Sequence, residues 1–466
     1  MVFSSAIFLF LFLPVTYLVY RLLPSQPLRN GWLALASLVF YGFGQPGYVL
    51  LLLSSVLANF LFGLWLQSMS KYRKWIAGFA VIINLLALGA FKYLDFLTGI
   101  WNSLSGMNLP LAGLVLPIGI SFYTFQGLSY VIDVYRDPQS GTRNPAKLLL
   151  YISFFPQLIA GPIIKYHDVS QQIDSRTLTP WLTLSGLQRF ILGFAKKLLI
   201  ANTAGQVADV VFAQSALDFR LAWLGAVCYT LQIYFDFSGY SDMAIGLGRI
   251  FGFSFLENFN LPYTARSIRE FWRRWHISLS SWFRDYVYIP LGGNRKGKIR
   301  TDINKFLVFF ATGLWHGANW TFILWGLWHG LFAALEDIGI IPKRLRECWF
   351  GHIYTMFVVI LGFTLFRADH LSSAGRIFAA MFTGFQCTAV NTLQLMALLD
   401  ARTVFLLLAG ICFAAGLPQK VFARIGERMP VLAQDIAKTL AYGALFAWSV
   451  LVLAGTTFNP FIYFQF

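Results

Sequence analysis

Two histidines in a short internal repeat are the first side chains in this sequence that could do chemistry. The pentapeptide Gly-Leu-Trp-His-Gly occurs at 313–317 and again at 326–330, which places His316 and His329 thirteen residues apart. On one continuous helix this separation is about 20 Å of rise, and the two side chains lie on largely opposite faces. They could not then share a metal ion or contact one reacting carbon, so a mechanism must choose between them.

His316 lies in an apolar run, residues 306–334, that contains only one other ionisable side chain. Ionisable groups in such runs are energetically expensive and usually face a cavity or the interior of a helix bundle. The side chain is therefore either a buried neutral histidine bonded to a helix neighbour or a functional base. Two features favour function. Gly313 and Gly317 leave space beside His316, and Asn319, three residues further on, could orient an imidazole or an oxyanion.

A third histidine and two carboxylates occupy further candidate positions. His276 follows Arg-Arg-Trp in a basic segment, where it either faces lipid head groups or is a polar lining residue at the mouth of a tunnel. Asp236 and Asp242 lie in the middle of a largely apolar segment, 222–253, where carboxylates are rare. They either mark a pathway or a helix-pairing site, or they cap a helix that breaks at the Ser-Gly dipeptide between them.

Several common catalytic and metal-binding patterns are absent from the sequence. It contains no Gly-x-Ser-x-Gly nucleophile elbow, no phosphate-binding P-loop and no dinucleotide fingerprint. The histidines have neither His-x₃₋₅-His nor His-Glu-x-x-His spacing, and the four cysteines are scattered, so we expect no metal site. A serine hydrolase and a zinc enzyme are therefore disfavoured.

The longest polar stretch inside the chain, residues 266–305, should position part of this chemistry. It contains ten Lys or Arg against three Asp or Glu, which predicts a cytoplasmic surface. Within residues 267–288 apolar side chains recur at steps of three and four, and basic residues fall between them. This pattern predicts an amphipathic helix in the membrane interface. Residues 290–300, which include three glycines, predict a turn.

The composition is that of an all-α polytopic membrane protein. Hydrophobic residues make up 57% of the 466 residues and charged residues only 12%, whereas soluble domains carry about 25% charged residues. Long uncharged runs such as 75–91 and 440–458 suit spanning helices, and shorter or broken runs such as 32–43 and 151–164 suit re-entrant segments. We therefore expect roughly 10–13 transmembrane and re-entrant helices together with interfacial amphipathic helices.

The net charge of +16 is better explained by the membrane than by nucleic acid. Lys and Arg concentrate in cytoplasmic loops and contact anionic head groups, and no basic helix stands apart from the apolar segments. Arg21 and Arg29 follow the first apolar run, which places the N-terminus outside the cytoplasm. No basic residue precedes that run and no small-residue cleavage site follows it, so we do not expect a removable signal peptide.

Three longer runs resemble the membrane-bound O-acyltransferase (MBOAT) family. They are QIYFDFSGYSDMAIGLG at 232–248, FWRRWHISLSSWFRDYVYIPLGGNR at 271–295 and GLWHGANW at 313–320. Shorter pieces, LPIGISFY at 116–123 and LIAGP at 158–162, agree, and the resemblance covers almost the whole chain. The most similar branch is the bacterial one that contains the membrane component of alginate O-acetyltransferase.

The resemblance implies a fold and two site residues. It implies one MBOAT-type membrane domain over residues 1–466, with N-terminal helices at 1–110, a catalytic core at 111–335 and C-terminal helices at 336–466. The histidine of the Trp-His-Gly-Ala-Asn context is the family's catalytic residue, here His316. The histidine of Trp-Arg-Arg-Trp-His, here His276, is a second recurrent site position, whereas His329 has no role in the family pattern.

The mechanism that we expect is acyl transfer to a hydroxyl. A neutral His316, buried among Leu314, Trp315 and Trp320, would take the hydroxyl proton during attack on a thioester or ester carbonyl. The candidate donors to the oxyanion are Asn319, His276 and the amides near Gly317. The residues expected to support the site or bind substrate are Asn319, Trp315, Arg273, Arg274, Arg284, Asp285 and Asn294.

No bound cofactor is expected, and acetyl-CoA is the expected donor. The basic face at 266–300 either holds the phosphates of acetyl-CoA or is plain positive-inside charge. The resemblance implies O-acetylation of an exported polysaccharide, alginate-like or cellulose-like, from the bacterial inner membrane. It also implies partners, namely a periplasmic or membrane-anchored subunit with an esterase-like fold and the export machinery.

Two alternatives remain open. The first, in the same chemical class, is D-alanyl transfer to teichoic acid. The second is a transporter or flippase in which His316 relays protons. No pair of matching halves from an inverted repeat supports the second alternative. Acyl transfer predicts a covalent product that depends on His316, whereas transport predicts substrate flux with no new ester.

Overall fold

Long helices built from the apolar runs confirm the predicted all-α membrane fold. The structure is a computed structural model that describes residues 1–455 and 461–462, and none of these described residues lies in a β-strand. The chain divides into two units, one formed by Met1–Phe190 with Met243–Glu257 and the other by Ile191–Asp242 with Asn258–Phe466. The helices α10 (Pro180–Ala195) and α12 (Phe219–Ile250) contribute residues to both units.

Four helices of the described chain are long and apolar enough to cross a membrane. The segments are Gly47–Ser68, Ser70–Lys92, Phe350–Arg367 and Val431–Ala454, and a bent pair of helices at 389–414 makes five if it counts as one span. Leu432, Leu440 and Leu451 along the last segment are exposed, as expected for a helix that faces lipid. The predicted total of ten to thirteen membrane segments therefore depends on shorter or broken helices.

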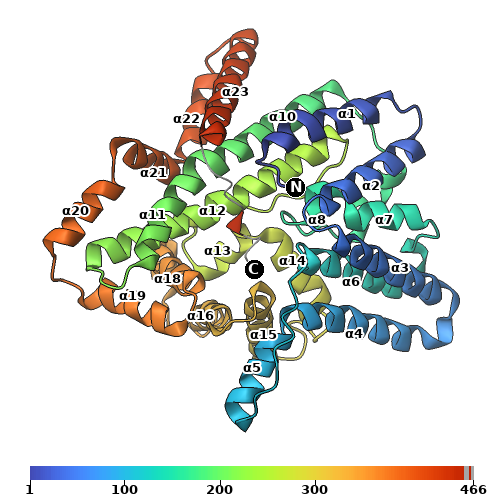
Figure 1. Cartoon of the computed structure of the whole chain (residues 1–466), viewed down its shortest axis with the longest axis horizontal. Helices are drawn as coiled ribbons and strands as arrows, with labels where there is room; N and C mark the ends of the chain where they lie inside the picture. The colour runs from blue at the N-terminus through green and yellow to red at the C-terminus, as the bar shows by residue number, and fades with distance from the viewer. Residues whose placement is uncertain (456–460, 463–466) are drawn as a thin grey trace. The chain divides into compact units, whose positions relative to one another are not determined.

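Three helices of the first unit pack around small and amide side chains. The helices α3 (Gly47–Ser68), α4 (Arg73–Lys92) and α6 (Ile120–Arg136) contact one another (Figure 1). Asn59 on α3 and Asn84 on α4 exchange hydrogen bonds of 3.2 and 3.0 Å between their side-chain amides. A Cβ atom on Gly127 of α6 would lie 2.6 Å from the Asn59 amide nitrogen, so glycine permits the contact. Small residues and interhelical amides of this kind pair helices in membranes.

The helices that lie wholly in the first unit are, in chain order, η1 (Phe8–Phe12), α1 (Leu13–Leu22), α2 (Gln26–Gly42), α3 (Gly47–Ser68), η2 (Ser70–Tyr72), α4 (Arg73–Lys92), α5 (Leu94–Ser105), α6 (Ile120–Arg136), η3 (Pro138–Ser140), α7 (Pro145–Ser153), α8 (Phe155–Leu158) and α9 (Tyr166–Asp174).

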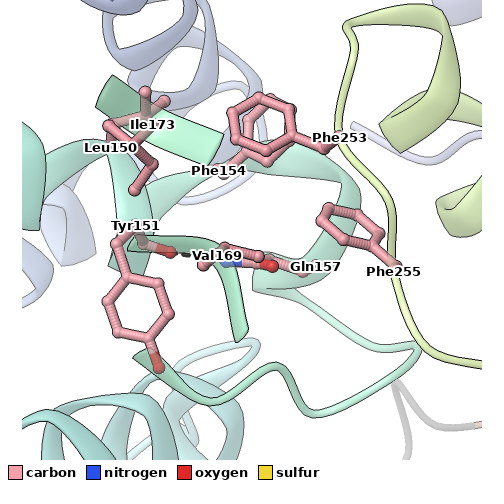
Figure 2. Close-up of a pocket in the computed structure, with 8 residues that line it drawn as sticks. All are labelled: Leu150, Tyr151, Phe154, Gln157, Val169, Ile173, Phe253 and Phe255. Carbon is pink, nitrogen blue, oxygen red and sulfur yellow. Dashed lines mark hydrogen bonds between the residues drawn. The ribbon is translucent and has the colours of Figure 1, made fainter. Parts of the chain in front are cut away.

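A small cavity in the first unit is too small for an acyl substrate. Figure 2 shows Tyr151, Phe154, Gln157 and Phe253 among the side chains that line it, and the Gln157 amide nitrogen donates a hydrogen bond to the Tyr151 carbonyl. The cavity volume is about 10 Å³, which is room for about one water molecule. The two candidate histidines, His276 and His316, belong to the second unit.

The helices that lie wholly in the second unit are η4 (Lys196–Ala201), α11 (Asn202–Ala213), η5 (Pro262–Thr264), α13 (Ile268–Arg274), α14 (Ile277–Phe283), η6 (Arg284–Tyr288), α15 (Lys298–His316), α16 (Trp320–Asp337), α17 (Lys343–Glu347), α18 (Phe350–Arg367), α19 (Leu371–Thr383), α20 (Ala389–Leu398), α21 (Ala401–Ala414), α22 (Leu417–Gly426) and α23 (Val431–Ala454).

The repeated pentapeptide lies on two packed helices, so the continuous helix considered from the sequence does not form. The helix α15 ends at His316, and α16 begins at Trp320 after a short break. A Cβ atom on Gly326 of α16 would lie 2.4 Å from the Phe309 carbonyl oxygen of α15, and one on Gly313 would lie 2.5 Å from a carbonyl of α16. The glycines of the repeat therefore let the two backbones approach closely.

We predict that Gly326→Ala destabilises the protein. The added methyl group would overlap the backbone of α15, and overpacking of this kind costs about 1–3 kcal/mol. Gly375→Ala is the matched control, because Gly375 lies within α19 and a Cβ atom there would meet open space. Alanine is favoured over glycine in a helix, so the control should be neutral or stabilising. Thermal unfolding of the purified variants in detergent measures both effects. Equal melting temperatures for the two variants would contradict the close approach of the α15 and α16 backbones.

The long helix α12 is continuous through Ser238 and Gly239, so the interpretation that Asp236 and Asp242 cap a broken helix is wrong. Its 32 residues correspond to about 48 Å. Asp236 pairs with Lys197, and Asp242 pairs with Lys196 at 2.6 Å. Both lysines come from the π-helix η4, and π-helical turns frequently occur at functional sites. The two carboxylates therefore pair helices, as the other interpretation predicted.

Candidate active site

His276 lies at a strained break between two short helices. The predicted amphipathic helix over 267–288 is divided, because α13 ends at Arg274 and α14 begins at Ile277. His276 between them has φ 42° and ψ 55°, a left-handed conformation that costs a residue other than glycine roughly 1–2 kcal/mol. Such strain tends to persist at functional sites. The break turns the side chain inward, where 0% of it is exposed, so of the two alternatives for His276 the one that faces lipid head groups is wrong.

Asn258 holds the break in place and was not identified from the sequence. Its side-chain oxygen accepts hydrogen bonds from the backbone N–H of Ser278 at 3.2 Å and from the Ser278 hydroxyl at 2.8 Å. The same oxygen lies 3.1 Å from His276 Nδ1. A single asparagine in a loop forms no recognisable pattern, so only this tertiary contact reveals its role.

Burial keeps the His276 ring neutral. The ring packs edge-on against Phe237, with centroids 4.6 Å apart, and near Phe259 and Trp315 at 6.5 and 6.0 Å. These side chains carry no charge to stabilise an imidazolium. Burial therefore lowers the pKa of His276 to about 3. Neither α13 nor α14 is among the described helices that are long and apolar enough to cross a membrane.

His316 is the last residue of α15 and is enclosed by aromatic rings. Its imidazole centroid lies 4.9 Å from Trp315, 5.0 Å from Trp325 and 5.1 Å from Phe366. Trp325, which the sequence did not single out, is one of the rings that bury His316, whereas half of Trp320 is exposed. Trp315 also neighbours His276. The structure thus brings together three predicted site residues, namely His276, Trp315 and His316.

The three-residue spacing predicted that Asn319 neighbours His316 on one helix, but Asn319 instead caps the next helix. It is the N-cap of α16, where its side-chain oxygen accepts a hydrogen bond from the Thr321 N–H at 3.1 Å. Its amide nitrogen donates to the Asp369 carbonyl at 2.8 Å. Both polar atoms therefore hold the chain that follows His316. The amides near Gly317 remain candidates for contact with an oxyanion.

The predicted supporting residues of the basic segment lie at the surface. Arg273, Arg284 and Asn294 are exposed, and Arg284 pairs with Asp285 at 2.7 Å. The two candidate histidines, in contrast, are buried. The turn predicted at 290–300 is confirmed as far as residue 297, and the last three residues of that range form the start of α15.

Arg274 lines an open pocket in the second unit. It donates to Glu270 at 2.7 Å and to the Thr264 hydroxyl at 3.2 Å. The pocket has a volume of about 710 Å³ and combines basic and aromatic side chains. Its lining residues include Tyr263, Thr264, Arg266, Glu270, Arg274, Trp349, His352 and Lys420. A pocket with three cationic side chains and one carboxylate suits an anionic ligand.

The sequence pattern that defines the membrane-bound O-acyltransferase family matches residues 39–340, which include His276 and His316. This chain belongs to the membrane-bound O-acyltransferase family. More than half of the chain is matched, and the all-α fold with apolar helices agrees with a membrane protein of this family.

Relatives of this MBOAT chain are named for acyl transfer. It is 41% identical over 505 residues to a probable alginate O-acetylase of Azotobacter vinelandii, with 100% of both chains covered. It is 37% identical to a peptidoglycan O-acetyltransferase of Helicobacter pylori, covering 82% of this chain and 80% of the relative. It is 33% identical to a teichoic acid D-alanyltransferase of Bacillus subtilis, covering 59% and 73%. This MBOAT protein is an acyltransferase.

His329, the second histidine of the repeated pentapeptide, also has an aromatic environment in this MBOAT enzyme. His329 on α16 is fully buried and stacks on Phe271, with ring centroids 6.0 Å apart, while Trp272 and Trp325 lie 5.3 Å away. Neither ring nitrogen has a hydrogen-bond partner among the described residues. We expect a packing role, which makes His329 a suitable control for His316.

Proposed function

We propose that this MBOAT enzyme moves acetyl groups from cytoplasmic acetyl-CoA toward hydroxyls of an exported polysaccharide. The observation that carries the proposal is the buried group of His276, Trp315 and His316, in which the Trp315 ring neighbours both imidazoles. The relatives named as alginate and peptidoglycan O-acetyltransferring enzymes support acetate as the transferred group and a polysaccharide as its destination.

The proposed chemistry needs one base and a donor to the oxyanion. His316 accepts the proton of the acceptor hydroxyl while the hydroxyl oxygen bonds to the acetyl carbonyl carbon. The C–S bond of the thioester then breaks, and the imidazolium returns its proton to the leaving thiolate, which yields an ester and a free thiol. Backbone amides at the helix break near Gly317 are the candidate donors to the oxyanion.

The acetyl group must then reach a polymer outside the cytoplasm. We assign the chain to the bacterial inner membrane with its N-terminus in the periplasm, because Arg21 and Arg29 follow the first apolar run. A periplasmic or membrane-anchored subunit with an esterase-like fold would receive the acetyl group and pass it to the polysaccharide during export.

The proposal is tested by deleting the gene in the producing strain and measuring O-acetyl ester in the exported polysaccharide. We expect loss of ester and its return when the wild-type gene is restored. Isolated membranes should also release CoA from acetyl-CoA only when the protein is present. Unchanged ester together with a loss of exported polymer would instead favour the transporter alternative.

A second candidate, D-alanyl transfer to teichoic acid, is favoured by the Bacillus subtilis relative. That match covers a smaller share of this chain than the acetylase matches do. Labelling cells with radioactive acetate or with D-alanine separates the two candidates. Protein-dependent ester label from D-alanine, with none from acetate, would replace the acetyl proposal.

The open pocket beside α13 is proposed to hold the phosphates of acetyl-CoA. Lys420 is an exposed cation in its lining. We predict that Lys420→Glu raises KM for acetyl-CoA about three- to tenfold at low salt and leaves kcat nearly unchanged, because an exposed charge contributes modest binding energy. The effect should shrink as salt screens the charges.

The matched control for this prediction is Lys438→Glu. Lys438 is exposed on α23 and does not line the pocket, so the same charge reversal there should leave KM unchanged. CoA release by membranes over a range of acetyl-CoA concentrations gives both constants. Equal KM values for the two variants would place the donor elsewhere.

A further inference from the structure

We infer that Asn258 is a positioning residue that fixes the tautomer of His276, so that His276 presents a proton acceptor to the reacting groups and not a donor. The inference deepens the proposed acyl transfer and rests on it. It also revises the expectation that His276 donates a hydrogen bond to the oxyanion.

The orientation of the Asn258 amide follows from its neighbours. The backbone N–H of Ser278 can only donate, and it lies 3.2 Å from Oδ1 of Asn258. That atom must therefore be the amide oxygen. The opposite end agrees, since the amide nitrogen donates to the Ser241 hydroxyl at 3.0 Å. Asn258 is itself buried, which leaves little freedom for the amide to rotate.

The tautomer of His276 follows from the amide orientation. An amide oxygen cannot donate, so His276 Nδ1, 3.1 Å away, must carry the proton of that hydrogen bond. The Ser278 hydroxyl, 3.4 Å from Nδ1, already donates to Asn258 and can accept a share of the same proton. In a neutral imidazole the other nitrogen then has a lone pair. His276 Nε2 is that nitrogen, and it is buried with no hydrogen-bond partner among the described residues.

The charges around His276 leave the ring neutral. The rings that face it belong to Phe237 on α12, Phe259 and Trp315 on α15. Ionisable residues also occur on these elements and on α13. Asp236 and Asp242 pair with lysines, and Arg274 pairs with Glu270. The others include the exposed Arg273 and the buried His316. A neutral Nδ1–H imidazole can take up a proton only through Nε2. His276 is therefore suited to take up the proton that His316 accepts from the acceptor hydroxyl.

The decisive variant is Asn258→Asp, which keeps the shape and the acceptor but adds a negative charge. The carboxylate stabilises the imidazolium and so raises the pKa of His276. The unprotonated base is then lost as pH falls through this raised pKa. The acid limb of kcat against pH should move upward by about one unit or more, while activity at high pH stays near the wild-type value.

Asn258→Leu removes the acceptor and releases the tautomer. We expect kcat to fall about 10- to 100-fold at every pH, with KM for acetyl-CoA unchanged. Asn304→Asp is the matched control, because Asn304 is also buried in the second unit but its amide nitrogen donates to the carbonyls of Leu291 and Gly293. Its pH profile should match that of the wild type after correction for the amount of protein in the membrane.

The outcomes separate this inference from the proposed function. Full activity in His276→Ala would remove His276 from the reaction altogether. Loss of activity in His276→Ala with an unshifted pH profile in Asn258→Asp would overturn the role of Asn258 alone. Nitrogen NMR of histidine-labelled wild-type protein gives a test that needs no folded variant of Asn258. A protonated Nδ1 and a bare Nε2 are expected for His276, and the reverse pattern would overturn the inference.

Discussion

Replacing His316 with alanine is expected to reduce ester formation by about 10²- to 10⁴-fold at normal protein abundance. This is the usual contribution of a general base, and without it the acceptor hydroxyl must lose its proton to water in an enclosed site. His316 is only 4% exposed and is surrounded by aromatic rings, so water cannot readily replace it. The measurement is the O-acetyl ester content of the exported polysaccharide, together with CoA release by isolated membranes.

The matched control for this prediction is His329→Ala. His329 is also buried and also contacts Trp325, so the two variants remove the same side chain from the same aromatic cluster. Activity per molecule should survive in His329→Ala even if the protein is less stable. Unchanged ester content in His316→Ala would exclude His316 as the general base of acyl transfer and favour a transport or scaffold role. Equal losses in both variants would indicate that the cluster acts through packing.

Replacing Lys197 with methionine is expected to give the largest loss of stability among single changes in the second unit. Lys197 is 4% exposed and its partner Asp236 is 2% exposed. Removing one member of a buried ion pair leaves an uncompensated charge and typically costs about 3–5 kcal/mol. The Ile462 N–H, which donates to Asp236 at 2.8 Å, remains but carries no full charge. The free energy of unfolding in detergent, measured with denaturant, gives the size of the effect.

Two further variants test whether charge burial is the cause. Lys196→Met removes the neighbouring lysine, which pairs with Asp242 but has a more exposed side chain, so its cost should be smaller. The double variant Lys197→Met with Asp236→Leu removes both buried charges and should recover most of the lost stability. A double variant that is as unstable as Lys197→Met would show that packing, and not charge, dominates at this position.

The sequence alone was sufficient for the class of protein and for the main candidates. The excess of apolar over charged residues predicts a membrane protein because lipid removes the need to hide apolar surface. The all-α fold follows, since helices satisfy their own backbone hydrogen bonds in lipid. The family was recognisable from the runs around His276 and His316, because a long specific pattern does not depend on knowing the fold.

The tertiary structure decided how the candidates meet. Spacing along the chain describes neighbours on one helix, so it fails wherever a helix breaks or continues unexpectedly. The break after His316 brings that residue and His329 to the same tryptophan, and it turns Asn319 into a helix cap. The continuity of α12 places two aspartates opposite two lysines.

Asn258 shows the same limit most clearly. It lies eighteen residues before His276 in sequence but 3.1 Å from its ring nitrogen in space. The sequence by itself determined that this is a membrane acyltransferase with two candidate histidines. Only the tertiary structure decided which polar atoms orient one of them, because hydrogen bonds between distant segments depend on how the backbone folds back, and local residue patterns do not encode that path.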